Sequence, residues 1–125
     1  MPSPGTPTAA PPGGEVLQPQ NGYVFIETKS GKTRCQMSLQ DVGCESEFTD
    51  APVIDGAHAN GVNVSADGQV SWVVGNLGDI PAVTLDYRVY HAVGWTIEAA
   101  SDGTRFTNDR SRHGMFVSVD GVEAF

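Results

Sequence analysis

Two cysteines that lie nine positions apart constrain the fold of this chain more than any other feature. Cys35 and Cys44 are the only cysteines, and the midpoint between them falls on Leu39 and Gln40. A tight turn there would place the cysteines opposite each other on neighbouring antiparallel strands, close enough for a disulfide. The spacing differs from that of zinc-binding or redox pairs. We therefore predict a disulfide across a β-hairpin; two reduced, buried cysteines are the alternative.

The same register predicts further opposed pairs. Met37 would face Val42, and Gln36 would face Gly43. We assign Met37 and Val42 to the face of the sheet that does not carry the cysteines. The disulfide would close a loop of about ten residues, which stabilises a fold by about 2–3 kcal/mol in the chain-entropy model. That is a large part of the stability of a small domain.

The chain is acidic, and its charge is unevenly distributed. Seven Lys and Arg residues stand against 15 Asp and Glu residues, which gives a formal net charge of −8. No Lys or Arg lies between Cys35 and Tyr87. The acidic residues of that stretch are Asp41, Glu45, Glu47, Asp50, Asp55, Asp67, Asp79 and Asp86. Such a surface argues against binding to nucleic acid or to anionic lipid, because both require basic contacts. A basic partner, a divalent cation or simple solubility would be compatible with it.

The first twenty residues differ from the rest in composition. They contain six of the eight prolines and few large apolar side chains. Such a segment cannot bury enough surface to offset the entropy of ordering. We predict a disordered, Pro-rich linker over residues 1–20 and a folded domain over residues 21–125. No apolar run approaches the roughly 18 residues of a membrane-spanning helix, so we expect no transmembrane segment.

From residue 21 onward, short alternating runs are separated by turn signals. The strands that we predict cover residues 23–28, 33–38, 42–47, 62–66, 69–74, 83–90, 95–99, 104–107, 115–119 and 122–125. Asp67-Gly68 and Asp120-Gly121 indicate hairpins. The connection over residues 48–60 contains a turn signal at Asp55-Gly56 and could hold one short helix. We therefore predict an all-β fold, a small antiparallel sandwich or barrel of hairpins with one disulfide.

One alternating run and one pair of residues give sharper expectations. The run over residues 83–90 predicts a single strand. Its inward residues would be Val83, Leu85, Tyr87 and Val89. Ile97 and Phe106 are nine positions apart, like the cysteines, and their midpoint falls between Ser101 and Asp102. We predict that Ile97 and Phe106 form a cross-strand pair by apolar contact.

The segment from Asn108 to Gly114 is the most promising functional site. It places Arg110, Arg112 and His113 together in an otherwise acidic protein. Arginine side chains form paired hydrogen bonds with carboxylate or phosphate groups. We therefore predict a binding site made of Asn108, Arg110, Arg112 and His113. The alternative is that the arginines pair with the acidic surface and that His113-Gly114 only shapes a turn.

The other chemistry-bearing residues form no recognisable catalytic or metal-binding pattern. His58, His91 and His113 show no metal-ligand spacing, and no G-x-S-x-G, P-loop or EF-hand motif occurs. We predict no cofactor and no catalytic residue. A looser calcium site that uses Asp50, Asp55 or Asp79 stays open.

Three short motifs carry a resemblance to a known family. The motif residues are Ser30, Gly31 and Cys35; Val42, Cys44 and Glu45; and Asn108, Ser111, His113 and Gly114. In these motifs the chain, over roughly residues 23–125, resembles small actinobacterial exported proteins and lipoproteins of unknown function, which are common in mycobacteria. It departs from them at Ile97 and Phe106, where a second cysteine pair is expected, and at Arg112 and Met115. The resemblance implies export and a small disulfide-stabilised domain, without an activity.

Together these features predict an extracytoplasmic, non-enzymatic binding or interaction domain of the bacterial cell envelope, either secreted or tethered. Its partner would be another envelope protein or an anionic envelope component, and not nucleic acid. A small hydrolase or lyase with an unrecognised site is one alternative. A carrier of a small apolar ligand is another.

Overall fold

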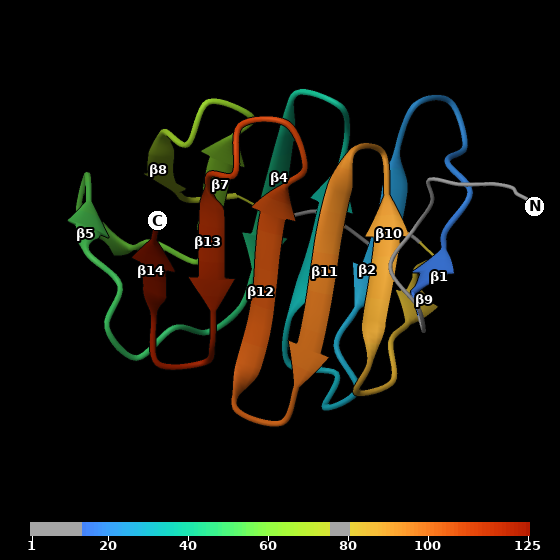
Figure 1. The fold of residues 1–125 in the computed structure, drawn as a ribbon. Helices are drawn as coiled ribbons and strands as arrows, with labels where there is room; N and C mark the ends of the chain where they lie inside the picture. The colour runs from blue at the N-terminus through green and yellow to red at the C-terminus, as the bar shows by residue number, and fades with distance from the viewer. Residues whose placement is uncertain (1–13, 76–80) are drawn as a thin grey trace, which may run out of the picture.

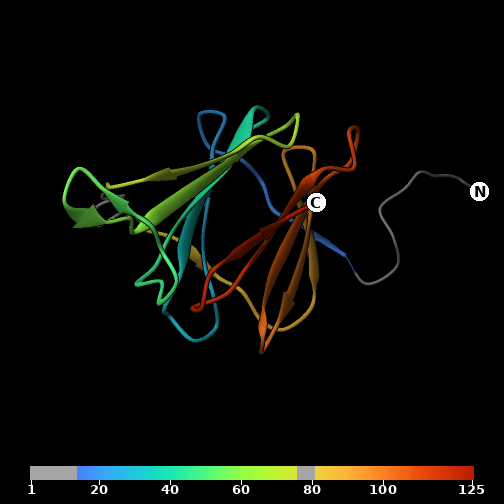
Figure 2. The ribbon, with the colours of Figure 1, turned by 90° about the vertical axis from the view of Figure 1, so that its left-hand side faces the viewer.

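The protein is a sandwich of two six-stranded sheets, seen face-on in Figure 1 and along its layers in Figure 2. The computed structural model describes residues 14–75 and 81–125. The first sheet consists, in spatial order, of β8 (Val70–Val73), β7 (Gly61–Ser65), β4 (Asp41–Glu45), β3 (Arg34–Met37), β2 (Val24–Glu27) and β9 (Val83–Thr84). The second consists of β1 (Glu15–Val16), β10 (Val89–Ala92), β11 (Trp95–Ala100), β12 (Gly103–Asn108), β13 (Gly114–Val117) and β14 (Val122–Ala124).

The predicted all-β fold is confirmed, and it is a sandwich rather than a closed barrel. Each sheet ends in two edge strands, and the described residues contain no helix. The 48–60 connection contains a small hairpin, β5 (Val53–Ile54) and β6 (Ala57–His58), around the predicted Asp55-Gly56 turn. This hairpin projects from the body of the sandwich (Figure 2). The hairpins at Asp67-Gly68 and Asp120-Gly121 also form as predicted.

The predicted disulfide lies at the centre of the first sheet. Cys35 on β3 faces Cys44 on β4, with their Cα atoms 4.0 Å apart, and the two are bonded. Met37 faces Val42, as predicted, but our assignment of this pair to the other face is wrong. Residues two apart on a strand share a face, so Met37 and Val42 are buried in the core beside the cysteines.

The core lies between the two sheets and draws on both of them. Its largest fully buried side chains are Trp95, Phe106, Ile26, Met37, Leu85, Ile97, Met115, Val42, Val62, Val64 and Cys35. Ile97 and Phe106 face each other across β11 and β12, which confirms the predicted apolar pair. Trp95 is buried, and its indole N–H donates a hydrogen bond of 2.9 Å to the Ser38 carbonyl of the other sheet.

The single strand predicted over residues 83–90 is wrong. The chain forms β9 in the first sheet, crosses between the layers, and continues as β10 in the second sheet. Leu85 is buried at the crossing, as predicted, whereas Val83 and Tyr87 are 49% and 47% exposed. Val89, also predicted to point inward, lies on the outer face of the second sheet, and its neighbour Tyr90 is buried instead. At this bend the Tyr90 hydroxyl accepts a 2.8 Å hydrogen bond from the amide of Asp86. The alternating pattern continues through this bend and therefore hides it.

The start of the ordered domain also differs from our prediction. Residues 1–13 of the predicted linker lie outside the described residues, but residues 14–20 belong to the sandwich. β1 pairs in parallel with β10, and the Leu17 amide donates a 2.8 Å hydrogen bond to the His91 carbonyl. Leu17 is buried. The burial of Leu17 and the pairing of β1 with β10 place in the sandwich a segment that composition assigns to a linker.

Candidate functional site

The predicted binding residues belong to the β12–β13 turn. This turn lies at one end of the sandwich together with the β3–β4, β7–β8 and β10–β11 turns, and we call this end the loop end (Figure 1). Two hydrogen bonds join the turns: the Asp109 amide donates to the Gly94 carbonyl over 2.9 Å, and the Ser111 hydroxyl donates to the Ala66 carbonyl over 2.5 Å. The β12–β13 turn is therefore fixed to both sheets.

Asn108 holds the turn in shape and is not available to a ligand. It is buried, and its side-chain oxygen accepts hydrogen bonds from the amides of Arg110 and Ser111, at 3.1 and 3.0 Å. Its carbonyl accepts a further bond from the Arg112 amide over 2.9 Å. Asparagine commonly plays this role, because its short side chain mimics a backbone turn. The structure thus places Asn108 beneath the site rather than in it.

His113 fixes the turn against the other sheet. Gly68, in the β7–β8 turn, lies so close that an added Cβ would fall 2.7 Å from the Cβ of His113. The His113 Nδ1 atom also contacts the Phe125 carbonyl at 3.2 Å. The side chain remains exposed, but these contacts match the alternative in which His113-Gly114 shapes a turn.

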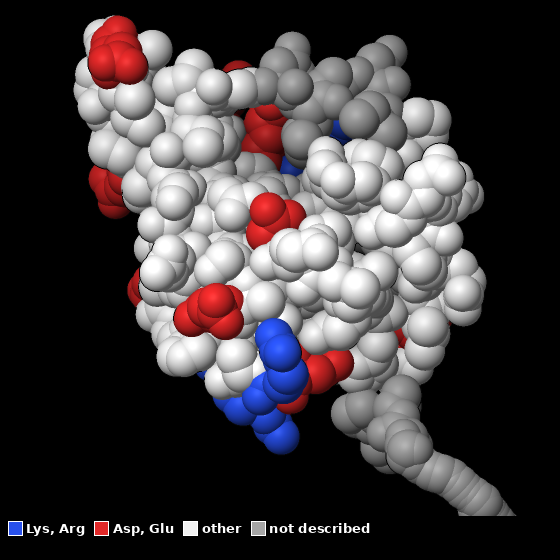
Figure 3. Space-filling model, turned by 90° about the horizontal axis from the view of Figure 1, so that it is seen from above, with Lys and Arg blue, Asp and Glu red and all other residues white. Residues whose placement is uncertain are grey.

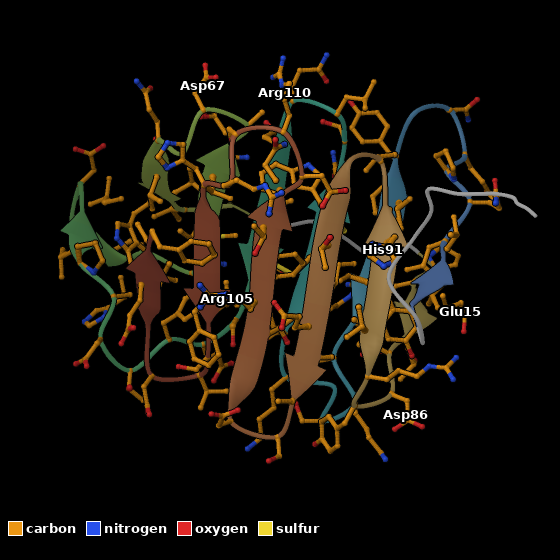
Figure 4. All side chains as sticks on the ribbon, in the orientation of Figure 1. Glu15, Asp67, Asp86, His91, Arg105 and Arg110 are labelled. Carbon is orange, nitrogen blue, oxygen red and sulfur yellow. A yellow bond between two sulfur atoms is a disulfide. The ribbon has the colours of Figure 1, made fainter. Side chains whose placement is uncertain are left out.

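Arg110 and Arg112 are the exposed part of the site. Arg110 projects from the loop end, at the same end as Asp67 (Figure 4). Within the described residues, neither guanidinium forms a hydrogen bond or an ion pair with another side chain. Arg112 has a φ of +68°, in the left-handed region, and its amide donates to the Asn108 carbonyl. The predicted alternative, in which both arginines pair with the acidic surface, finds no support in these contacts.

Three other basic residues lie against acidic side chains, which distinguishes them from the two arginines. Lys29 pairs with Asp86 at 3.0 Å, and Arg88 pairs with Glu15. Arg105 lies 3.9 Å from Glu98 and stacks on the Phe125 ring. Figure 3 looks down on the loop end and shows basic side chains gathered at one margin, with acidic side chains beside them. This margin is a local positive feature on an acidic protein.

A groove that the sequence did not predict runs from the arginine turn over the outer face of the second sheet. It has a volume of about 340 Å³. Its lining residues are Val89, Thr96, Glu98, Thr107, Asp109 and Arg112. Strand alternation placed Thr96 and Thr107 on the outer face, and the Ile97–Phe106 register set them opposite each other. The position of Arg112 beside them depends on the turn geometry, which sequence alone does not determine.

A larger groove, of about 440 Å³, lies on the outer face of the first sheet. Gly43 and Gly61 leave room there between polar side chains, among them Gln36 and Asn63. It reaches Gly75, where the first described range ends. Neither of the two free arginines lies in it.

The remaining candidate chemistry is dispersed. In residues 14–75 and 81–125, no three His, Cys, Asp or Glu side chains come close enough to hold a metal ion. Of the acids considered for calcium, Asp50 and Asp55 are exposed and Asp79 lies outside the described residues. Over the same residues, no helix is long and apolar enough to cross a membrane. Comparisons with known proteins add nothing: no family model, no curated protein and no solved structure matches this chain.

Proposed function

We propose that this protein is a non-enzymatic binding domain of the bacterial cell envelope, located outside the cytoplasm, and that Arg110 and Arg112 contact an anionic partner. One observation carries the proposal. Two exposed guanidinium groups lie on a turn that is fixed to both sheets, and neither has an acidic partner among the described residues. Their guanidinium groups can form paired hydrogen bonds with a carboxylate or a phosphate, and because the turn backbone is already fixed, only the side chains would have to be ordered on binding.

The disulfide supports a location outside the cytoplasm. The Cys35–Cys44 bond is buried in the core, where it adds to the stability of a small domain. Such bonds persist mainly in oxidising compartments. The resemblance to exported actinobacterial proteins points the same way.

The two alternative functions gain no comparable support. An enzyme built on His113 would need its imidazole beside converging acids, but Nδ1 contacts the Phe125 carbonyl instead. A carrier of an apolar ligand would need a cavity between the sheets, where the buried side chains of the core now pack together.

The proposal can be tested with three anionic probes of different class. These are D-glucuronic acid, a glutamate-rich peptide and phosphatidylglycerol vesicles. We expect the protein to bind at least one of them, and the double variant Arg110→Gln/Arg112→Gln to bind it about tenfold more weakly or worse. Lys32→Gln is the matched control, because it removes one positive charge from a turn at the opposite end. Absence of binding to all three probes, or equal binding by the double variant, would contradict the proposal.

A further inference from the structure

The groove beside the arginine turn has the properties of a small-ligand site. Its volume of about 340 Å³ falls within the range of pockets that hold small molecules. It lies over β10, β11 and β12 on the outer face of the second sheet. Arg112 lines it, whereas Arg110 does not. The two arginines therefore differ in what they can contact.

The charges in the groove leave one group without a partner. Asp109 accepts a hydrogen bond of 2.5 Å from the Thr96 hydroxyl, and Glu98 lies 3.9 Å from Arg105. Both acids are thus engaged. Arg112 has no side-chain partner in the described part of the chain. Arg112 is therefore the charged group of the groove lining that lacks a side-chain partner, and an anionic group on a ligand would supply one.

The two threonine hydroxyls of the groove also differ in whether they have a side-chain partner. The single proton of the Thr96 hydroxyl is directed at Asp109, so its 3.3 Å contact with the Nδ1 atom of His91 requires the imidazole to donate. Thr96 is thus already committed. Thr107, its neighbour across the strands, has no such side-chain partner among the described residues, and its hydroxyl can both donate and accept.

The position of the groove disfavours a peptide strand as its ligand. β11 and β12 are interior strands, whose backbone groups are paired on both sides. A peptide could not extend the sheet there and would have only side chains to contact. A dense anionic surface is also disfavoured, since the net charge of −8 repels it at close approach. A small molecule with one discrete acidic group meets neither obstacle.

We infer that this groove binds an acidic saccharide, which is a sugar that carries one carboxylate or phosphate group. The acidic group binds Arg112. Ring hydroxyls bind Thr107 and the second carboxylate oxygen of Asp109, and the apolar face of the ring packs on Val89. The inference rests on the proposed function and specifies the ligand class of the same surface.

The test measures dissociation constants for D-glucuronic acid, D-glucose 6-phosphate and uncharged D-glucose. We expect at least one acidic sugar to bind at least tenfold more tightly than glucose. Arg112→Gln should remove this preference, because it removes both the charge and the forked donor. Thr107→Val should weaken binding about threefold, as expected for one neutral hydrogen bond. Lys32→Gln, which removes one positive charge from the β2–β3 turn at the opposite end of the sandwich, is the matched control and should change binding by less than about twofold.

The carboxylate and phosphate sugars distinguish the two sources of the acidic group. Equal binding of glucose and both acidic sugars would overturn the inference. So would acidic-sugar binding that Arg110→Gln abolishes and Arg112→Gln does not affect. If the glutamate-rich peptide or the vesicles bind through the arginines while both acidic sugars fail, the proposed function stands and this inference is wrong. Circular dichroism of each variant checks that the fold is retained.

Discussion

The two sheets are built to the same plan, although their sequences differ. Each half of the chain supplies five strands of one sheet, and its short first strand pairs in parallel with the first long strand of the other half: β1 with β10, and β9 with β2. A buried leucine follows each of these short strands. Leu17 donates its amide proton to the His91 carbonyl, and Leu85 donates to the Glu27 carbonyl, both over 2.8 Å. The halves are therefore interlocked by exchanged edge strands.

The equivalence extends across every strand of both sheets. One row of the first sheet is Val83, Ile26, Cys35, Cys44, Val62 and Trp72. The matching row of the second sheet is Glu15, Tyr90, Ile97, Phe106, Met115 and Ala124. The disulfide and the Ile97–Phe106 pair thus occupy the same place. At this place in each sheet, two buried side chains face each other across neighbouring strands. In the first sheet they are joined by a disulfide, and in the second they are in apolar contact.

The halves differ most in the connection after the fourth strand of each sheet. Between β4 and β7 the chain uses residues 46–60, which include the β5–β6 hairpin and three acids. Between β12 and β13 it uses residues 109–113, which include Arg110 and Arg112. The shared plan accounts for the fold, so the proposed binding function belongs to a connection in which the halves diverge.

The largest expected effect comes from the two central pairs. Phe106→Ala should lower the free energy of unfolding by about 3–5 kcal/mol, since it opens a cavity at a fully buried site. The double variant Cys35→Ala/Cys44→Ala should lower it by about 2–3 kcal/mol, through loss of the closed loop. Chemical denaturation measures both. Leu39→Ala, at an exposed site, is the control, and a smaller loss for Phe106→Ala than for the cysteine variant would contradict the equivalence.

A second comparison concerns two glycines at matching positions on β7 and β13. A Cβ on Gly114 would fall 1.8 Å from the Phe106 carbonyl oxygen, whereas a Cβ on Gly61 would meet the end of the Val73 side chain at 2.8 Å. Backbone cannot move aside as a side chain can. Gly114→Ala should therefore destabilise the fold by about 3 kcal/mol and Gly61→Ala by about 1 kcal/mol. Thermal unfolding would refute this if the two losses were equal.

The exchanged first strand gives a third prediction. Removal of residues 1–20 should leave a protein about 2–3 kcal/mol less stable than removal of residues 1–13, because only the longer deletion removes β1 and buried Leu17. Denaturant midpoints of the two deletions measure the difference. Leu17→Ala in the full chain should show a similar loss. Identical midpoints would mean that β1 contributes nothing to the sandwich.

The smallest expected effect is electrostatic and concerns the ion pair between Lys29 of the first half and Asp86 of the second half. The hydrogen bond from Lys29, with the amide of Tyr87, lowers the pKa of Asp86 below its ordinary value of 3.8. A lowered carboxyl pKa stabilises the fold above pH 3.8, and this contribution is lost as the pH falls through the lowered value. An NMR titration of Lys29→Gln should show the Asp86 pKa rise toward 3.8 while staying below it. An unchanged Asp86 pKa in this variant would rule out the ion pair.

Sequence reasoning succeeded where local spacing determines the structure. The nine-residue separations predicted both central pairs, because opposed residues are equidistant from a turn. Sequence reasoning failed at residues 83–90, because the alternation of apolar residues continues through the crossing between the sheets. It also failed at residues 14–20, because the burial of Leu17 depends on strands far along the chain. In the candidate site, charge identified Arg110 and Arg112. The roles of Asn108 and His113 and the groove beside Arg112 depend on how the turn packs on both sheets, which no local pattern records.

The most direct test of this account is to map the amide chemical-shift changes that D-glucuronic acid causes over the whole protein. The changes should be confined to the groove and its turn, at Val89, Thr96, Thr107, Asp109 and Arg112. Matching positions of the first sheet should stay unaffected, among them Phe25 and Arg34. Changes centred on the outer face of the first sheet, or spread equally over both sheets, would contradict it.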